Sequence, residues 1–194
     1  MNLQHLNIKI MVAQPEAIDF ELFIPLFHRW IQTKATDEML IDVADYLHVP
    51  EGPGVMLIGH EALMSLDNVE NRWGFLYNRR TPMDGSNTEK MNKVMKVTLG
   101  HARRLEEDSS LSGKLKFRGE DLQLIFNDRL LTPNTDDTFR ALEPDLNAFL
   151  NRLYSGTPYL LKRHSDPRER LTLDVKAEKG FGVNELLRNI GDRI

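Results

Sequence analysis

The chain has 194 residues, enough for one large domain or two small ones, and its 41% hydrophobic and 28% charged residues are typical of a globular protein. Its 25 basic and 29 acidic residues give a formal net charge of −4, so nucleic-acid binding, which needs dense Lys and Arg, is not expected. The absence of cysteine excludes disulfides, thiolate nucleophiles and iron–sulfur clusters. No stretch approaches the roughly 18 apolar residues of a membrane helix, and residues 1–13 lack the apolar core of a signal peptide. We therefore predict a cytoplasmic protein with no membrane contact.

The first half of the chain is predicted to form strands and two helices, with a three-strand meander between the helices. Alternating apolar residues indicate strands, and apolar residues recurring at a period near 3.6 indicate helices. Pro25 predicts a short turn followed by a main helix that begins at the proline. The expected strands cover 7–12, 39–49, 55–66 and 73–79, and the expected helices cover 19–32 and 88–107.

The second half follows a Ser-rich linker at residues 109–113 and repeats a similar order of elements. It is predicted to contain short strands, a long helix, a hairpin and a final short helix. The expected strands cover 114–118, 122–126, 129–131, 159–164 and 171–177, and the expected helices cover 137–154 and 183–190.

The two halves also share a residue pattern. Phe20–Ile31 and Phe139–Leu150 carry apolar residues and one proline at matching positions, at a constant offset of 119 residues. Chance is the alternative explanation, because amphipathic helices with a proline are common. We predict an α+β fold of two ferredoxin-like-related halves of the βαββ(β)α type, an internal duplication, with a mostly antiparallel sheet packed by helices. The halves, 1–110 and 111–194, are expected to pack as one compact unit.

The familiar catalytic signatures are absent from the sequence, including the phosphate-binding loop, His-Glu-x-x-His and Gly-x-Ser-x-Gly. Residues 175–187 resemble the guanine-recognition loop of small GTPases, but the segment lacks the serine and no phosphate loop accompanies it. We interpret this segment as a glycine-permitted turn between a strand and a helix. No metal site is predicted, and no cofactor can be named.

One face of the predicted meander is the candidate site. Alternation places Ile41, Val43, Leu47 and Val49, with Val55, Leu57 and Leu63, toward the core. The opposite face then carries Leu40, Asp42, Ala44, Tyr46, His48, Met56, Ile58, His60, Ala62 and Met64. A tight hairpin pairing His48 with Met56 would bring His60 within reach of Asp42.

Three interpretations of this mixed face stay open. It is packed against the other half of the chain, it is the interface of a homodimer, or it lines a pocket for a small molecule. In the last case Asp42, His48 and His60 are the candidate catalytic residues of a small hydrolase-like enzyme. Tyr46, Met56, Ile58 and Arg79 are the candidate ligand-binding residues.

A basic hairpin in the second half is the candidate anion site. It carries Lys162, Arg163, Arg168 and Arg170, which suit phosphate or carboxylate groups and allow weak nucleotide or RNA binding. The alternative is that these charges only keep strand edges soluble. The preferred function is a ligand- or partner-binding α+β module without a standard catalytic motif.

Overall fold

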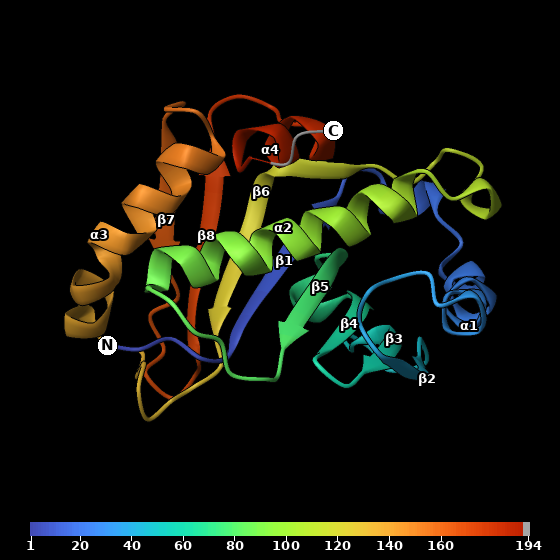
Figure 1. Cartoon of the computed structure of the whole chain (residues 1–194), viewed down its shortest axis with the longest axis horizontal. Helices are drawn as coiled ribbons and strands as arrows, with labels where there is room; N and C mark the ends of the chain where they lie inside the picture. Colours follow the sequence, from blue (N-terminus) through green and yellow to red (C-terminus); the bar gives the residue numbers. More distant parts are fainter. Residues whose placement is uncertain (192–194) are drawn as a thin grey trace.

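A single sheet of eight antiparallel strands forms the framework of the protein in the computed structural model, which describes residues 1–191 (Figure 1). The strand order across the sheet is β2-β3-β4-β5-β1-β6-β8-β7. The strands are β1 (Leu6–Val12), β2 (Leu40–Tyr46), β3 (Gly54–Gly59), β4 (Ala62–Asp67), β5 (Gly74–Arg79), β6 (Phe117–Phe126), β7 (Tyr159–Arg163) and β8 (Leu171–Ala177). The predicted α+β class with a mostly antiparallel sheet is confirmed.

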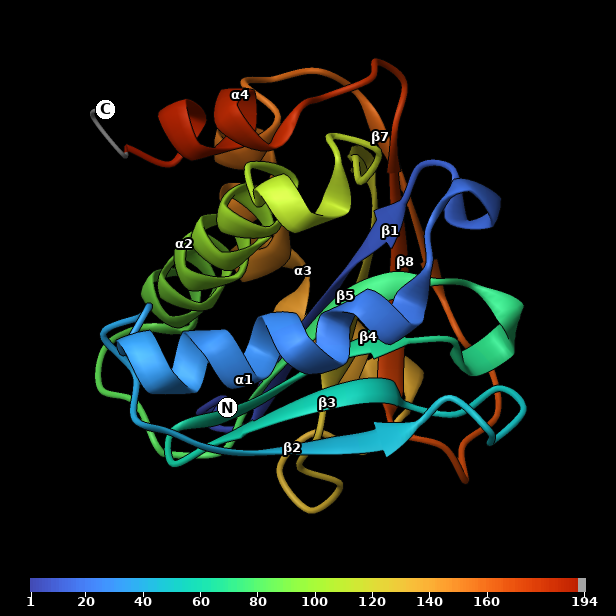
Figure 2. The same cartoon turned by 90° about the vertical axis from the view of Figure 1, so that its right-hand side faces the viewer.

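The α-helices lie against one face of the curved sheet (Figure 2). They are α1 (Phe23–Thr33), α2 (Asn87–Glu106), α3 (Asp136–Leu153) and α4 (Val183–Asn189), with short 3₁₀ turns η1 (Pro15–Ala17), η2 (Phe20–Leu22), η3 (Val69–Asn71) and η4 (Ser109–Leu111). Alternate residues of the central strands join the buried faces of these helices in one hydrophobic core. We call the other side of the sheet the open face. No helix of the described residues is long and apolar enough to span a bilayer.

Strand β1 connects the two halves of the sheet. It pairs with β5 of the first half on one edge and with β6 of the second half on the other. In each half the first strand leads through a helix to the outermost strand, β2 or β7, and the chain then returns strand by strand to the centre. Both sides of β1 are buried along its whole length.

The long helix α2 shows why the helix predictions from periodicity were reliable. Its buried residues follow one stripe from Met91 to Leu105, and a capping box between Ser86 and Glu89 closes its first turn. Helices α3 and α4 also lie within one residue of their predicted bounds. Pro25 is the third residue of α1, where its missing N–H is harmless, but Pro144 lies inside α3.

The predicted strand 55–66 is wrong, because it is two strands joined by a turn at His60 and Glu61. The turn reverses the direction of the chain and shifts the alternation of side chains. Ala62 and Met64, which were expected on the open face, are therefore buried in the core. Leu63, which was expected in the core, pairs with Ile58 on the open face.

Two further predicted elements differ in the structure. The strands predicted at 114–118 and 122–126 form one strand, β6, whose register against β1 shifts between Ile10 and Met11. That bulge accommodates the turn expected near Gly119 without ending the strand. No strand forms at residues 129–131. Val43 of β2 and Leu47, directly after it, pack against the core as predicted. Ile41 is 55% exposed because a register irregularity follows Leu40.

We expect the sheet to unfold as one unit, because β1 is shared by both halves. Ile8 is fully buried and pairs with Tyr77 and Leu124, so Ile8→Ala should cost about 2–5 kcal/mol. Both tryptophans, Trp30 and Trp73, lie in the first half. Tryptophan fluorescence and far-UV circular dichroism should therefore give coincident urea transitions, in the wild type and in the variant.

The control is Leu130→Ala, because this side chain is 94% exposed. It should leave the free energy of unfolding nearly unchanged. Separate fluorescence and circular-dichroism midpoints would show that the two halves unfold independently.

Candidate functional site

The structure does not bring Asp42, His48 and His60 together. Asp42 pairs with Ile58 in the hairpin, and its carboxylate accepts a hydrogen bond from the backbone N–H of Val43. His60 lies in the turn after β3, 65% exposed and 3.7 Å from Glu61. His48 lies beyond the opposite end of β2. The expected pairing of His48 with Met56 is wrong, because the turn after β2 is longer than predicted and Ala44 pairs with Met56 instead.

The other residues nominated on the meander are also separated. Tyr46, Met56 and Ile58 lie on the open face of β2 and β3, where Tyr46 is 41% exposed and stacks near His48. Arg79 lies on the helix-covered side of β5, where its guanidinium is 3.5 Å from the Tyr77 hydroxyl. These residues do not form one pocket.

The four basic residues of the second-half hairpin are also separated from one another and have different partners. Arg163 bonds to Asn134 and Asp136, and Arg168 forms a two-contact ion pair with Asp166 in its own loop. Lys162 lies on the edge strand β7, opposite Asp174 of β8 in the strand register. Arg170 alone of the four lines a cavity.

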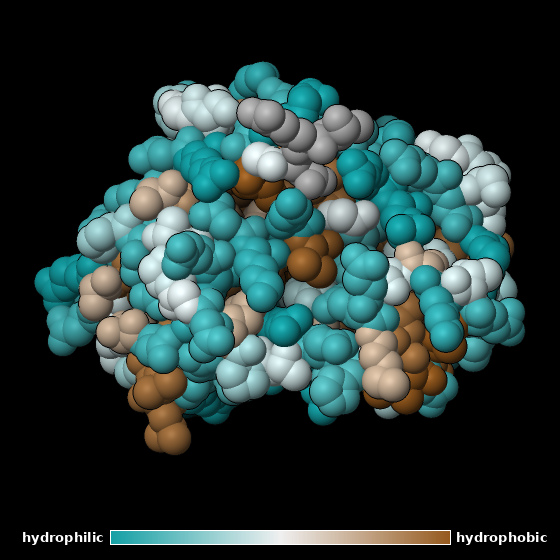
Figure 3. All heavy atoms as spheres, in the orientation of Figure 1, coloured by the Kyte–Doolittle hydropathy of each residue, from teal (hydrophilic) through white to brown (hydrophobic). Residues whose placement is uncertain are grey.

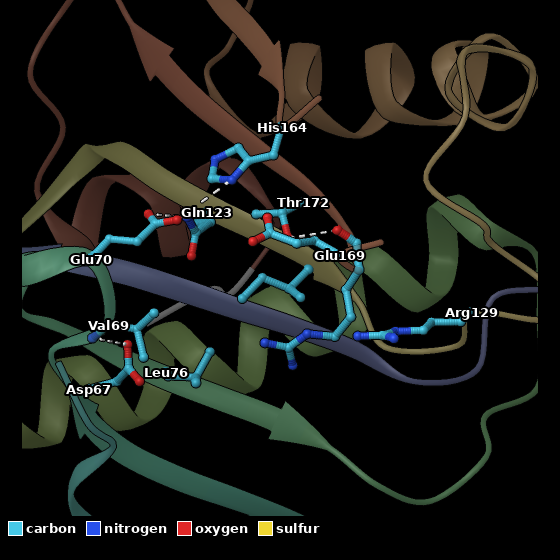
Figure 4. A pocket seen from close by; sticks show the side chains of 11 residues that line it. Asp67, Val69, Glu70, Leu76, Gln123, Arg129, His164, Glu169 and Thr172 are labelled. Carbon is cyan, nitrogen blue, oxygen red and sulfur yellow. Dashed lines mark hydrogen bonds and ion pairs between the residues drawn. The ribbon is translucent and has the colours of Figure 1, made fainter. Parts of the chain in front are cut away.

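That cavity, of about 240 Å³, lies on the open face of the sheet (Figure 4). Its walls come from β4, β5, β6 and β8, from η3, and from the loops that follow β6 and β7. Figure 4 shows Glu70 and Asp67 on one side of the cavity and Arg129 on the opposite side, with Gln123 and Thr172 between them. The lining residues are Asp67, Val69, Glu70, Leu76, Gln123, Ile125, Arg129, His164, Glu169, Arg170 and Thr172.

A buried ion pair lies at the edge of this cavity. Lys9 of β1 donates to the carboxylate of Asp67 in β4, and the two side chains are 2% and 6% exposed. Burial lowers the pKa of Lys9 more than the neighbouring carboxylate raises it. The Asp67 carboxylate also accepts the backbone N–H of Val69, which ties η3 to the sheet.

A larger charged network adjoins the cavity on β6 and β8. Arg72 lies 2.8 Å from the Asp174 carboxylate and 3.0 Å from that of Asp121. His164 Nε2 lies 2.9 Å from the other oxygen of Asp174. Burial raises the pKa of Asp174, but the hydrogen bonds from Arg72 and His164 outweigh it and hold that pKa below its ordinary value. The network ties together β6, β8, the segment after η3 and the loop after β7.

His164 is not free to act as a general base. Its Nε2 is bonded to Asp174, and its Nδ1 lies 3.6 Å from the carboxylate of Glu70. The hydroxyl of Thr172 already donates to the backbone carbonyl of Arg170. Among residues 1–191 no group of His, Asp and Glu has the arrangement that could hold a metal ion.

Two arginines at the cavity lack protein partners. Within the described part of the chain, the guanidinium groups of Arg129 and Arg170 make no ion pair or hydrogen bond. Nearby, Asn7 is fully buried on the open face, in register beside Ile125, and neither atom of its amide has a partner. Unpaired buried polar groups are costly and call for a specific explanation. These features single out the cavity as a place for a polar ligand.

Of the cavity residues, only Arg170 was nominated from the sequence. The others lie far apart in the chain and meet only because β1 aligns β5 with β6, and β6 aligns with β8. One signal was available: Asn7 and Lys9 interrupt an otherwise apolar central strand. Polar residues at buried strand positions are unusual enough to mark that face.

We predict that Lys9 and Asp67 stabilise the fold as a pair. Lys9→Met leaves a buried carboxylate without its counterion and should lower the free energy of unfolding by about 3–5 kcal/mol. The double variant Lys9→Met, Asp67→Leu should recover most of that loss, because no uncompensated charge remains. Urea denaturation of the two variants measures the difference. The prediction is contradicted if Lys9→Met lowers the free energy of unfolding by less than the double variant does.

Comparison with known proteins adds no further constraint. No protein-family model matches the chain, and no curated protein and no solved structure matches it. The functional argument therefore depends on the geometry of the open-face cavity and on the charges around it.

Proposed function

We propose that the protein binds a small molecule bearing a carboxylate or phosphate group in the open-face cavity. The observation that carries the proposal is the pair of unpartnered arginines, Arg129 and Arg170, in a cavity beside which Lys9, Asp67, Arg72, Asp121 and Asp174 are already tied in ion pairs. Guanidinium groups bind carboxylates and phosphates through parallel hydrogen bonds. Two of them in the lining of one cavity can form an anion site.

The opposite end of the cavity suggests the rest of the ligand. The carboxylate of Glu70 and the amide of Gln123 lie across from Arg129 (Figure 4). Leu76 and Ile125 add apolar side chains to the lining of the cavity. The cavity, at about 240 Å³, is smaller than the roughly 300–1,000 Å³ of typical ligand sites. A compact ligand with an acidic group at one end and a hydrogen-bond donor at the other, such as an amino acid, fits this polarity.

The test is a ligand screen against the intact protein. Small carboxylates, amino acids and phosphate monoesters should be compared by thermal shift and then by calorimetric titration. We expect acidic ligands to raise the Tm and simple amines to have no effect. Because hydrogen bonds to charged groups contribute about 1.5–3 kcal/mol, Arg170→Gln should weaken binding by about tenfold or more.

Arg168→Gln is the matched control, since it removes an arginine from the same loop that is already paired with Asp166. It should leave the affinity unchanged. If no acidic ligand binds the wild type at millimolar concentration, or if Arg129→Gln and Arg170→Gln both leave binding intact, the proposal is wrong.

We also propose that the outer part of the meander mediates self-association. Edge strand β2 exposes Ile41 and Tyr46, at 55% and 41%, and Met39 just before it is 65% exposed. Figure 3 shows hydrophobic residues gathered over the region of β2 and β3 at the lower right. Unpaired edge strands with apolar side chains are natural contact surfaces.

Sedimentation at increasing protein concentration tests this second proposal. The wild type should shift from monomer to dimer, and Ile58→Lys should stay monomeric, because it places a charge on the open face of β3. Arg140→Gln, on α3, is the control and should dimerise normally. A wild type that is monomeric at high concentration would contradict the proposal.

Two earlier predictions stay predictions. The internal, ferredoxin-like duplication is supported by the shared order of strand, helix and returning strands in each half. Against it, Pro25 lies in the first turn of α1 whereas Pro144 lies well inside α3. The cytoplasmic location is supported by the lack of cysteine alone.

A further inference from the structure

A second cavity lies on the opposite side of the molecule from the open face. It is about 380 Å³ in volume and runs between the outer face of α2 and the segment 34–38 that connects α1 to β2. We call it the α2 groove. Its lining residues are Lys34, Ala35, Thr36, Asp37, Glu38, Lys93, Lys96, Val97, Gly100, His101, Arg103 and Arg104. Five of these are Lys or Arg, in a chain whose net charge is −4.

The cations of α2 form one stripe along the groove. Lys93, Lys96, Arg103 and Arg104 recur at helical spacing over a length of about 16 Å, at ~1.5 Å per residue. Lys34 faces them from the C-terminal end of α1, where it adopts a left-handed conformation with φ of 49°. In the described part of the chain, Lys34, Lys93 and Arg103 have no ion-pair partner.

Within the described residues, the carboxylates that line the groove do not form ion pairs with Lys34, Lys93 or Arg103. Glu38 accepts hydrogen bonds from Tyr77, at 2.5 Å, and lies 2.9 Å from His101 Nε2. Arg79 lies 3.6 Å from the same carboxylate. Burial raises the pKa of Glu38, but the hydrogen bonds from His101 and Tyr77 outweigh it and lower that pKa overall. Asp37 is the remaining acidic residue, so the groove is electropositive.

Gly100 provides an independent indication of a ligand. It is the fourteenth residue of the 20-residue helix α2, where alanine would be more stable, and its backbone is in ordinary helical conformation. Within residues 1–191, and apart from its chain neighbours and the adjoining backbone of α2 itself, no atom lies within 4 Å of the position that a Cβ would occupy. Neither packing nor backbone geometry therefore requires glycine. Glycine does permit a ligand to approach the helix backbone closely, at the middle of the cationic stripe.

We propose that the α2 groove binds a small molecule with adjacent phosphoryl groups, laid across Gly100 between the lysines and the arginines of α2. Closely spaced cations match the charge density of an oligophosphate, and the arginines bind its oxygens in pairs. A hollow of about 380 Å³, closed on one side by segment 34–38, suits a small molecule better than a nucleic acid. A nucleic acid would need an extended basic surface.

Calorimetric titration of the full chain with tripolyphosphate and with ATP tests the proposal and separates a free oligophosphate from a nucleotide. Both should bind at low salt, and the affinity should fall as salt rises. Lys93→Gln and Arg103→Gln should each weaken binding by about fivefold or more. Arg140→Gln, an exposed arginine of α3 that is paired with Asp137 outside both cavities, is the control and should leave this binding intact.

Substitution of Gly100 gives the sharpest readout. Gly100→Ala should raise the Tm by about 2–4 °C, because alanine favours the helix, and should at the same time weaken tripolyphosphate binding. Gly100→Leu should weaken it further. If the Tm of each variant is at or above that of the wild type, a loss of binding cannot come from unfolding.

Three results would overturn the inference. The first is an absence of tripolyphosphate and ATP binding at low salt. The second is binding that Gly100→Leu and Arg103→Gln leave unchanged. The third is a single-stranded RNA that binds the stripe more tightly than either small molecule, which would assign the surface to nucleic acid instead.

Discussion

The placement of the helices on one face of the sheet is the constraint on which the rest of the structure depends. The open face has no helix to cover it, yet the central strand β1 is buried on both sides. Turns and loops therefore close over the middle of that face and bring polar groups with them. These polar groups form ion pairs with one another. Lys9 pairs with Asp67, and Arg72 pairs with both Asp121 and Asp174. The cavity remains where this closure is incomplete.

The elements with strong local signals were predictable from the sequence. The apolar stripe of α2 and its capping residues mark a helix without any tertiary information. The turn at His60 and Glu61 was missed because the apolar residues continue on both sides of it, and a tight turn needs few residues to reverse the chain. That single omission shifted the alternation and placed Met64 on the wrong face. The nominated Asp42–His60 site depended on that alternation.

The cavity residues could not have been predicted in the same way. Glu70, Gln123 and His164 are separated by long stretches of chain and carry no shared motif. Their proximity follows from the pairing of β1 with both β5 and β6, which no local pattern specifies. His101 of α2 is also held by a residue distant in the chain, because its buried ring lies 2.9 Å from the carboxylate of Glu38. Polar residues in apolar strands were the usable signal.

The two proposed sites lie on opposite faces of the sheet, and β5 contributes to both. Leu76 lines the open-face cavity, and the next residue, Tyr77, points to the other side and bonds to Glu38 beside the α2 groove. Coupling between ligands requires an element with two arrangements that both ligands bias. Here the connecting strand is hydrogen-bonded on both edges, to β4 and to β1, which holds it in one arrangement. Because side chains alternate along β5, one strand contributes to both proposed sites, and we expect their ligands to bind without coupling.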